Sequence, residues 1–175
     1  RAECAAHYYG LIEMIDRHVG RILDCLRTSG LEEETVVMFM TDHGEALGDH
    51  GMWGKGPYHF DGVIRVPFVV KWPGHFVPGK NYSEVVSYLD FAPTILDLAG
   101  LPIPQGPLPR IIEAPAMPPP WPGRSLVPVL TGKEMSDPVP ALVEEDEDYL
   151  GFRMRTLVTR RYRLTAYSGK PYGEL

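Results

Sequence analysis

The sequence predicts an α/β fold with helices flanking a mainly parallel sheet, and a small antiparallel β-sheet region at the carboxyl side. Residues 6–28 carry apolar side chains at helical spacing, and the apolar, β-favouring run at residues 35–40 follows them. A helix that leads into a buried strand is the repeating unit of a covered, mainly parallel sheet. Residues 141–144, 153–159 and 161–167 alternate as half-buried strands of an antiparallel sheet do.

The first helix is predicted from the difference between its two faces. The opposite face is mainly charged, and the Ser29-Gly30 pair is a plausible C-terminal stop. The apolar face carries Tyr8, Leu11, Ile12, Ile15, Val19, Ile22, Leu23 and Leu26.

Later elements are predicted from shorter patterns. Residues 66–71 and 84–89 are expected to form strands, and residues 91–99 a helix that Asp90 caps and that has Pro93 in its first turn. Prolines are dense from residue 102 onward, which predicts an extended connection over residues 102–124 and separates residues 1–101 from residues 125–175.

Two expectations concern the second part of the chain. Residues 125–131 are expected to form a short turn of helix. The acidic run at residues 144–148 is expected to be a solvated loop between two strands, and the arginines at 153, 155, 161 and 163 the wet side of a strand pair rather than a nucleic-acid surface.

Composition restricts the partners and the compartment. The net charge of −6 gives no support for nucleic acid or an anionic membrane as a partner. No apolar run approaches the roughly 20 residues of a membrane span. Cys4 and Cys25 fall on one predicted helix, about 30 Å apart, and so cannot bridge. Two reduced cysteines favour a cytoplasmic location, although the sequence leaves the compartment undetermined.

The residues that carry chemistry lie directly after the predicted strand at 35–40. Asp42 and His43 are ordinary ligands for a divalent cation, and Lys55 supplies a point charge suited to an anionic oxygen. Glycines between them allow tight turns and close approach of a ligand to the backbone. The predicted site is therefore a metal beside an anion pocket.

Four further residues are candidates for the same pocket. For His50, a contact with the substrate or leaving group and an orienting hydrogen bond within the loop are both open. His59 and Asp61 are candidates for the pocket mouth, with packing as the alternative for each. Trp53 is expected to be a wall of the pocket.

A family resemblance enters on these motifs. The chain resembles the second metal-binding block of type I sulfatases, within the alkaline phosphatase superfamily, and is most similar to the branch of choline sulfatases and phosphonate monoester hydrolases. The motifs are Asp42-His43-Gly44-Glu45, Leu47-Gly48-Asp49-His50-Gly51, Trp53-Gly54-Lys55-Gly56, Arg65-Val66-Pro67, Trp72-Pro73-Gly74, Asp90-Phe91-Ala92-Pro93-Thr94 and Leu96-Asp97-Leu98-Ala99-Gly100.

The resemblance implies an enzyme that hydrolyses small anionic sulfate esters with a divalent metal ion, Mn, Ca or Mg. It implies that Asp42 and His43 bind the metal and that Lys55 neutralises substrate charge, with residues 1–101 as the carboxyl-side part of the α/β core and residues 125–175 as a truncated part of the small sheet. The family's nucleophile is a formylglycine made from a Cys-x-Pro-x-Arg segment. Neither Cys4 nor Cys25 has that context, so the nucleophile is expected upstream and this chain alone is expected to be inactive.

Three alternatives remain open at this point. The same residues suit a phosphonate monoester or phosphodiester hydrolase of the same superfamily. A non-catalytic metal-binding or assembly domain is an alternative from another class. A homo-oligomer is compatible with either.

Overall fold

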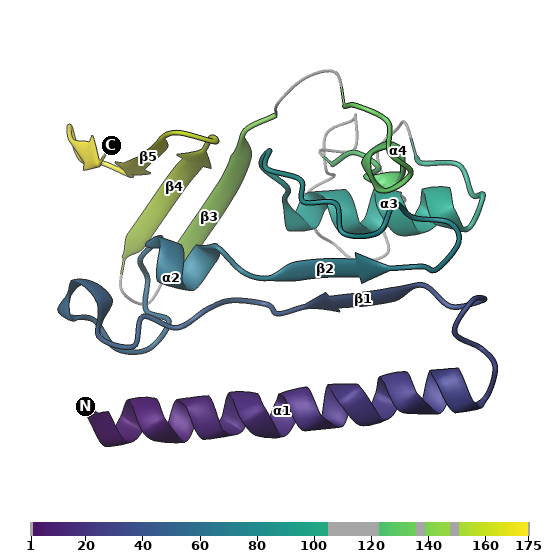
Figure 1. Cartoon of the computed structure of the whole chain (residues 1–175). Helices are drawn as coiled ribbons and strands as arrows, with labels where there is room; N and C mark the ends of the chain where they lie inside the picture. Colours follow the sequence, from purple (N-terminus) through teal and green to yellow (C-terminus); the bar gives the residue numbers. More distant parts are fainter. Residues whose placement is uncertain (1, 105–122, 136–138, 148–150, 175) are drawn as a thin grey trace, which may run out of the picture. The chain divides into compact units, whose positions relative to one another are not determined.

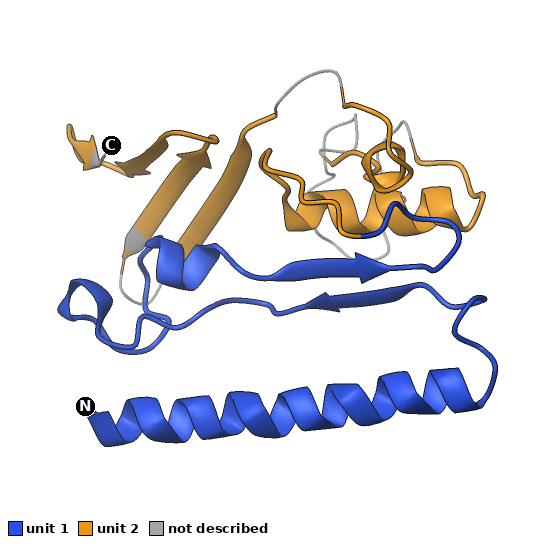
Figure 2. Cartoon of the chain, in the orientation of Figure 1, with its two compact units in different colours: residues 1–78 blue, residues 79–175 orange. Residues whose placement is uncertain are grey.

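The structure is a computed structural model that describes residues 2–104, 123–135, 139–147 and 151–174. It divides into two compact units, residues Arg1–Pro78 and Gly79–Leu175, shown in blue and orange in Figure 2. Each unit is described here by itself. Most of the proline-rich connection predicted at residues 102–124 lies outside the described residues.

Unit 1 begins with the long helix α1 (Ala2–Thr28), which Figure 1 shows as one continuous helix. Its end at Thr28 confirms the stop predicted at Ser29-Gly30. The apolar face is present but not covered: no residue of α1 is buried, and Ile22 is 62% exposed. No helix in the described part of the chain is both long enough and apolar enough to cross a bilayer.

The remainder of unit 1 is a two-stranded sheet with a loop and a short helix between its strands. Strand β1 (Val37–Met40) pairs with β2 (Phe68–Lys71), and the 3-10 turn η1 (Asp49–Gly51) and helix α2 (Asp61–Ile64) lie in the connection. Beside the strands, Lys71 Nζ lies 2.5 Å from Glu32 Oε1, and Trp72 Nε1 donates to the Glu33 carbonyl over 3.0 Å.

The expected mainly parallel sheet does not occur among the described residues. Every strand pair that they form is antiparallel, including β1 with β2, where Met40 lies opposite Phe68. β1 is also not buried, since Phe39 is 41% exposed. A short apolar run predicts a strand, but it does not specify the direction of the neighbour.

Unit 2 begins with a 3-10 turn where a strand at residues 84–89 was predicted, and that prediction is wrong. Ser87 starts η2 (Tyr88–Asp90): its hydroxyl accepts from the Leu89 N–H, while its own N–H donates to Asp90 Oδ2 over 2.9 Å. This reciprocal capping box favours a turn over an extended strand. Helix α3 (Phe91–Leu98) follows as predicted, with Pro93 in its first turn.

Asp90 does not cap α3, contrary to the prediction. Its side chain makes no capping bond to that helix. Instead, Oδ2 accepts from Ser87 and Oδ1 accepts from the backbone N–H of Arg124 over 2.9 Å. The Asp90 carboxylate therefore joins segments that are far apart in sequence. Helix α4 (Val127–Leu130) confirms the turn of helix expected at residues 125–131.

The predicted antiparallel sheet at the carboxyl side is confirmed. Its order is β3 (Ala141–Glu147), β4 (Phe152–Val158), β5 (Arg163–Tyr167) and β6 (Gly173–Glu174), the last of which was not predicted. The hydroxyls of Thr156 and Thr165 lie 2.8 Å apart in its buried interior.

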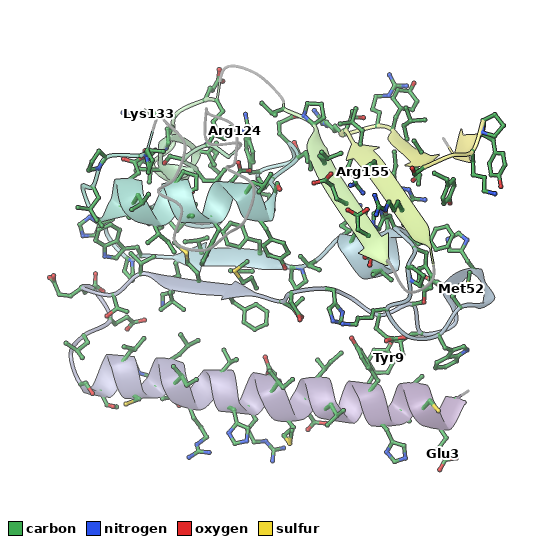
Figure 3. The ribbon with its side chains drawn as sticks, turned by 180° about the vertical axis from the view of Figure 1, so that it is seen from behind. Glu3, Tyr9, Met52, Arg124, Lys133 and Arg155 are labelled. Carbon is green, nitrogen blue, oxygen red and sulfur yellow. The ribbon has the colours of Figure 1, made fainter. Side chains whose placement is uncertain are left out.

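The acidic run is a strand and not the expected loop over residues 144–147. Arg155 explains how the charges are tolerated: its guanidinium lies 2.5 Å from Glu144 Oε1 and 2.8 Å from Asp146 Oδ1 across the β3–β4 pair. Figure 3 shows Arg155 on the exposed side of this sheet. This contact confirms the wet-face interpretation for Arg155.

Candidate functional site

The candidate site begins where β1 ends, at Asp42 and His43. The Asp42 carboxylate accepts from the His43 backbone N–H over 3.0 Å at Oδ1, and its other oxygen lies 3.6 Å from His43 Nε2. The Asp42 side chain is 83% exposed and that of His43 is 40% exposed. An imidazole nitrogen and a carboxylate oxygen thus lie next to each other and open to solvent.

The hydrogen bonds of His43 assign the roles of its ring nitrogens. Nδ1 lies 2.8 Å from the Gly44 carbonyl oxygen, which can only accept, so Nδ1 carries the proton in this bond. In the neutral ring, Nε2 then has the free lone pair, and this is the atom beside Asp42. A ring nitrogen oriented in this way by a bond at its other nitrogen is typical of metal-binding histidine.

Asp42 is held in its ionised form. The His43 backbone N–H is the main cause, and it lowers the pKa of the Asp42 carboxyl below its ordinary value of 3.8, with smaller contributions from the nearby His43 ring and the Thr41 hydroxyl. The carboxylate is therefore charged at neutral pH, as a metal ligand must be.

The chain after His43 packs on α2 at a point where only glycine fits. The Gly44 N–H donates to the Val63 carbonyl over 2.7 Å, and a Cβ at Gly44 would overlap the Gly62 carbonyl oxygen. Ala46 and Val63 are both buried at this contact. The close approach fixes the direction in which the loop leaves β1.

The loop then folds back on itself through residues 46–54. The Ala46 N–H donates to the Gly54 carbonyl over 3.4 Å and the Gly48 N–H to the Met52 carbonyl over 2.8 Å. Met52 is 41% exposed and is labelled in Figure 3 on the outer part of this loop. The turn brings Lys55 back to the chain that carries Glu45.

Glu45 and Tyr58 hold this turn, a role that the sequence did not predict for either residue. Glu45 Oε1 accepts from the Gly54 N–H over 2.5 Å and from the Leu47 N–H over 3.2 Å. The Tyr58 hydroxyl donates toward the carbonyl oxygens of Gly54 and Trp53. Burial, together with the nearby Glu45 carboxylate, raises the pKa of the Tyr58 hydroxyl, so it stays protonated. No local pattern would have revealed the bond from Gly54 to Glu45, because it joins residues nine positions apart.

The structure places Lys55 directly after this held segment, with its side chain exposed. Trp53 is 38% exposed, and its indole lies against Gly48, where an added Cβ would be 3.5 Å from the ring. Trp53 thus packs within the loop, and its role as a pocket wall stays a prediction. Lys55, Asp42 and His43 belong to one continuous loop between β1 and α2.

The other three candidates, His50, His59 and Asp61, differ in their contacts and burial. The exposed His50 ring stacks on Phe60, with 3.9 Å between centroids and an interplanar angle of 13°. His59 is 6% exposed. Asp61 begins α2, and its exposed carboxylate lies 3.9 Å from Arg65. His59 is thus buried whereas Asp61 is exposed, and a place at the pocket mouth stays a prediction for both.

The donor set at Asp42 and His43 fits a divalent ion as part of a site. A carboxylate oxygen and an imidazole nitrogen 3.6 Å apart suit neighbouring positions around one ion. Within the described residues, no group of three or more His, Cys, Asp or Glu side chains forms a complete set. A hard divalent ion takes about six donors, so the two donors of Asp42 and His43 would make up only part of such a set.

Comparison with known proteins decides the family. The model of the family described as "Sulfatase" matches residues 3–101, which is more than half of the chain. The chain belongs to the sulfatase family. This confirms the predicted sulfatase family, but not the predicted branch within it, and it places the chain in the alkaline-phosphatase-like superfamily of hydrolases.

Individual relatives agree with the family assignment. An arylsulfatase of Clostridium perfringens is 42% identical over 103 residues, covering 57% of this chain and 21% of the relative. A choline-sulfatase of Rhizobium meliloti is 35% identical over 133 residues, covering 75% of this chain and 23% of the relative. The chain therefore spans between a fifth and a quarter of the length of these curated relatives.

Solved structures share the fold of this sulfatase-family chain. A crystal structure of a putative sulfatase from Bacteroides thetaiotaomicron superposes with a TM-score of 0.74 at 26% identity, over 92% of this chain and 33% of the other. A 2-O GAG sulfatase superposes with a TM-score of 0.71 at 26% identity, over 89% of this chain and 32% of the other.

Proposed function

We propose that the complete protein hydrolyses sulfate esters in a metal-dependent reaction, and that this chain supplies part of its metal and anion site. The observation that carries the proposal is the Asp42–His43 pair, with Nε2 and Oδ2 3.6 Å apart and Nδ1 engaged by the Gly44 carbonyl. Membership of the sulfatase family and the sulfatase names of the relatives support the sulfate ester as substrate.

The chemistry of sulfate esters explains why these residue types are needed. The sulfur centre is shielded by negative oxygens, so an enzyme must neutralise charge there as the transition state forms. A divalent ion held in part by Asp42 and His43 would supply Lewis-acid polarisation at that centre. The Lys55 ammonium would pair with a non-bridging oxygen and offset the charge that builds up on it.

The nucleophile is proposed to be a formylglycine outside this chain, because neither Cys4 nor Cys25 has the Cys-x-Pro-x-Arg context. On this proposal the isolated chain has no sulfatase activity. Among sulfatases, the choline-sulfatase branch is proposed from the Asp42-to-Gly56 motif. A choline-sulfatase is among the relatives, at 35% identity over 133 residues, which supports this branch.

A second candidate within the superfamily is hydrolysis of phosphonate monoesters or phosphodiesters, since Asp42, His43 and Lys55 suit those anions equally well. Substrate profiling of the complete enzyme separates the two. Turnover of p-nitrophenyl sulfate should exceed that of p-nitrophenyl phenylphosphonate and bis-p-nitrophenyl phosphate, and a chelator should abolish it. Preference for either phosphorus ester would contradict the sulfatase proposal, and chelator-resistant turnover would contradict the metal.

A further inference from the structure

Both backbone polar groups of Gly54, the residue just before Lys55, are hydrogen-bonded. The Gly54 N–H donates to Glu45 Oε1 over 2.5 Å, and its carbonyl accepts from the Ala46 N–H over 3.4 Å and from the Tyr58 hydroxyl. Gly54 itself has φ +82°, in the left-handed region that favours glycine. Both backbone polar groups of Gly54 and its backbone conformation are thus specified.

Glu45 holds this point as a charged acceptor. A carboxylate that accepts backbone N–H groups forms bonds roughly twice as strong as those between neutral groups. One oxygen, Oε1, receives both the Gly54 and Leu47 N–H groups, and the side chain is half-buried. The bond to Gly54 joins the start of the loop, next to His43 and Gly44, to the residue that precedes Lys55.

Tyr58, which follows Gly54 in the sequence, also binds the backbone at Trp53 and Gly54. Its hydroxyl lies 3.3 Å from the Trp53 carbonyl oxygen and also donates toward the Gly54 carbonyl. The ring lies directly against Gly56, where an added Cβ would overlap its edge. The two peptide carbonyls that precede Lys55 therefore share one donor.

We propose that Glu45 and Tyr58 are positioning residues that fix the backbone at Trp53–Gly54 and thereby the place from which Lys55 presents its ammonium to the substrate anion. This inference rests on the proposed function of Lys55. A lysine side chain is long and flexible, so a defined backbone origin reduces the volume that its nitrogen samples. A misplaced group can cost about 100-fold in rate even when it is otherwise intact.

The test uses the complete enzyme with p-nitrophenyl sulfate as substrate. Glu45→Ala should lower kcat/KM about 10- to 100-fold. Glu45→Gln keeps an oxygen acceptor and should restore most of the activity. Glu134→Ala, which removes an exposed carboxylate in unit 2, should leave kcat/KM unchanged. Equal losses in Glu45→Gln and Glu45→Ala would overturn the proposal, because they would mean that the charge of Glu45 acts directly.

A double variant tests whether Glu45 acts through Lys55. Glu45→Ala combined with Lys55→Ala should be no less active than Lys55→Ala alone. Multiplying losses would overturn the proposal. If kcat/KM of Lys55→Ala alone equals that of the wild type, the proposed role of Lys55 fails. The contacts of Glu45 and Tyr58 with Gly54 would then have no function in positioning Lys55.

Hydrogen exchange tests the bond between Glu45 and Gly54 separately from the role of Lys55. In Glu45→Ala the Gly54 amide should exchange faster than in the wild type, whatever Lys55 does. Unchanged exchange would overturn the assignment of Glu45. Should Glu45→Ala fail to fold, Tyr58→Phe removes only the hydroxyl. It should likewise lower kcat/KM, and wild-type activity in Tyr58→Phe would remove Tyr58 from the proposal.

Discussion

The loop after β1 and the segment after α3 are held by different kinds of contact. In the loop, Gly44 approaches Gly62 so closely that backbone meets backbone. In unit 2, side chains of residues 90–97 hold residues 124–126: Asp90 binds Arg124, Thr94 binds Leu126, and Asp97 binds Ser125. At Gly44 the loop therefore requires the absence of a side chain, whereas residues 124–126 of unit 2 are held by side chains that must be present.

The largest expected effect is on the chemistry of the loop. Asp42→Ala in the complete enzyme should reduce metal-dependent kcat by about 1,000-fold or more, because a carboxylate that holds a Lewis acid is lost. Steady-state kinetics on an aryl sulfate measures this loss. Asp24→Ala, a carboxylate change on the exposed surface of α1, should leave kcat unchanged. Near-normal turnover of the Asp42 variant would contradict the metal assignment.

The next effect tests the backbone contact of the loop. Gly44→Ala should lower the free energy of unfolding by about 2–3 kcal/mol, since the new Cβ forces the loop away from the Gly62 carbonyl. Denaturant unfolding measures the change. Gly10→Ala is the matched control: a Cβ there meets no atom within 4 Å, and the helix should gain up to about 1 kcal/mol. Equal effects of the two variants would mean that the close approach is not required.

A smaller loss of unfolding free energy is expected in unit 2 when the Thr94 hydroxyl is removed. The buried Thr94 hydroxyl donates to the Asp90 carbonyl over 2.6 Å and accepts from the Leu126 N–H over 2.9 Å. Thr94→Val keeps the shape but removes both bonds, and should cost about 2 kcal/mol of unfolding free energy. Thr94→Ser retains the hydroxyl and should cost less. A larger loss in Thr94→Ser than in Thr94→Val would show that the methyl group, not the hydroxyl, matters.

The smallest effect concerns the exposed charges of β3 and β4. The Arg155 guanidinium lowers the pKa of Asp146 below its ordinary value of 3.8 by hydrogen bonding and by charge. A lowered folded-state pKa means that the pair stabilises the fold above about pH 4 and that this contribution is lost as the pH falls further.

Arg155→Ala should therefore weaken the dependence of stability on pH below about pH 4, with only a slight effect at neutral pH because the pair is exposed. Unfolding measured across that pH range provides the test, with Lys170→Ala as a control for loss of positive charge. An unchanged acid dependence in Arg155→Ala would contradict the assigned pairing.

Local patterns predicted the elements that depend on neighbouring residues. The spacing of apolar residues gave α1, and the Pro93 region gave α3. The motif around Asp42 singled out Asp42 and His43, and the structure brings His43 Nε2 within 3.6 Å of Asp42 Oδ2; that the two bind a metal stays a prediction. Alternation of apolar and polar residues gave the antiparallel sheet of unit 2.

Features that depend on distant partners were not predictable. Asp90 was expected to cap α3, but its carboxylate accepts from the backbone N–H of Arg124, 34 residues further along the chain. The acidic run of β3 resembles a loop until Arg155 is placed across from it. Nothing in the sequence around Glu45 indicates that its carboxylate accepts a hydrogen bond from the Gly54 N–H. The antiparallel direction of β1 and β2 is likewise a property of the loop between them.

The central claim is that Asp42 and His43 hold a divalent ion, and metal content tests it most directly. The complete protein, dialysed against metal-free buffer and analysed by mass spectrometry, should retain a divalent ion, and His43→Ala should lose most of it. His18→Ala on α1 should retain the ion as the wild type does. Metal content in His43→Ala equal to that of the wild type would contradict the account.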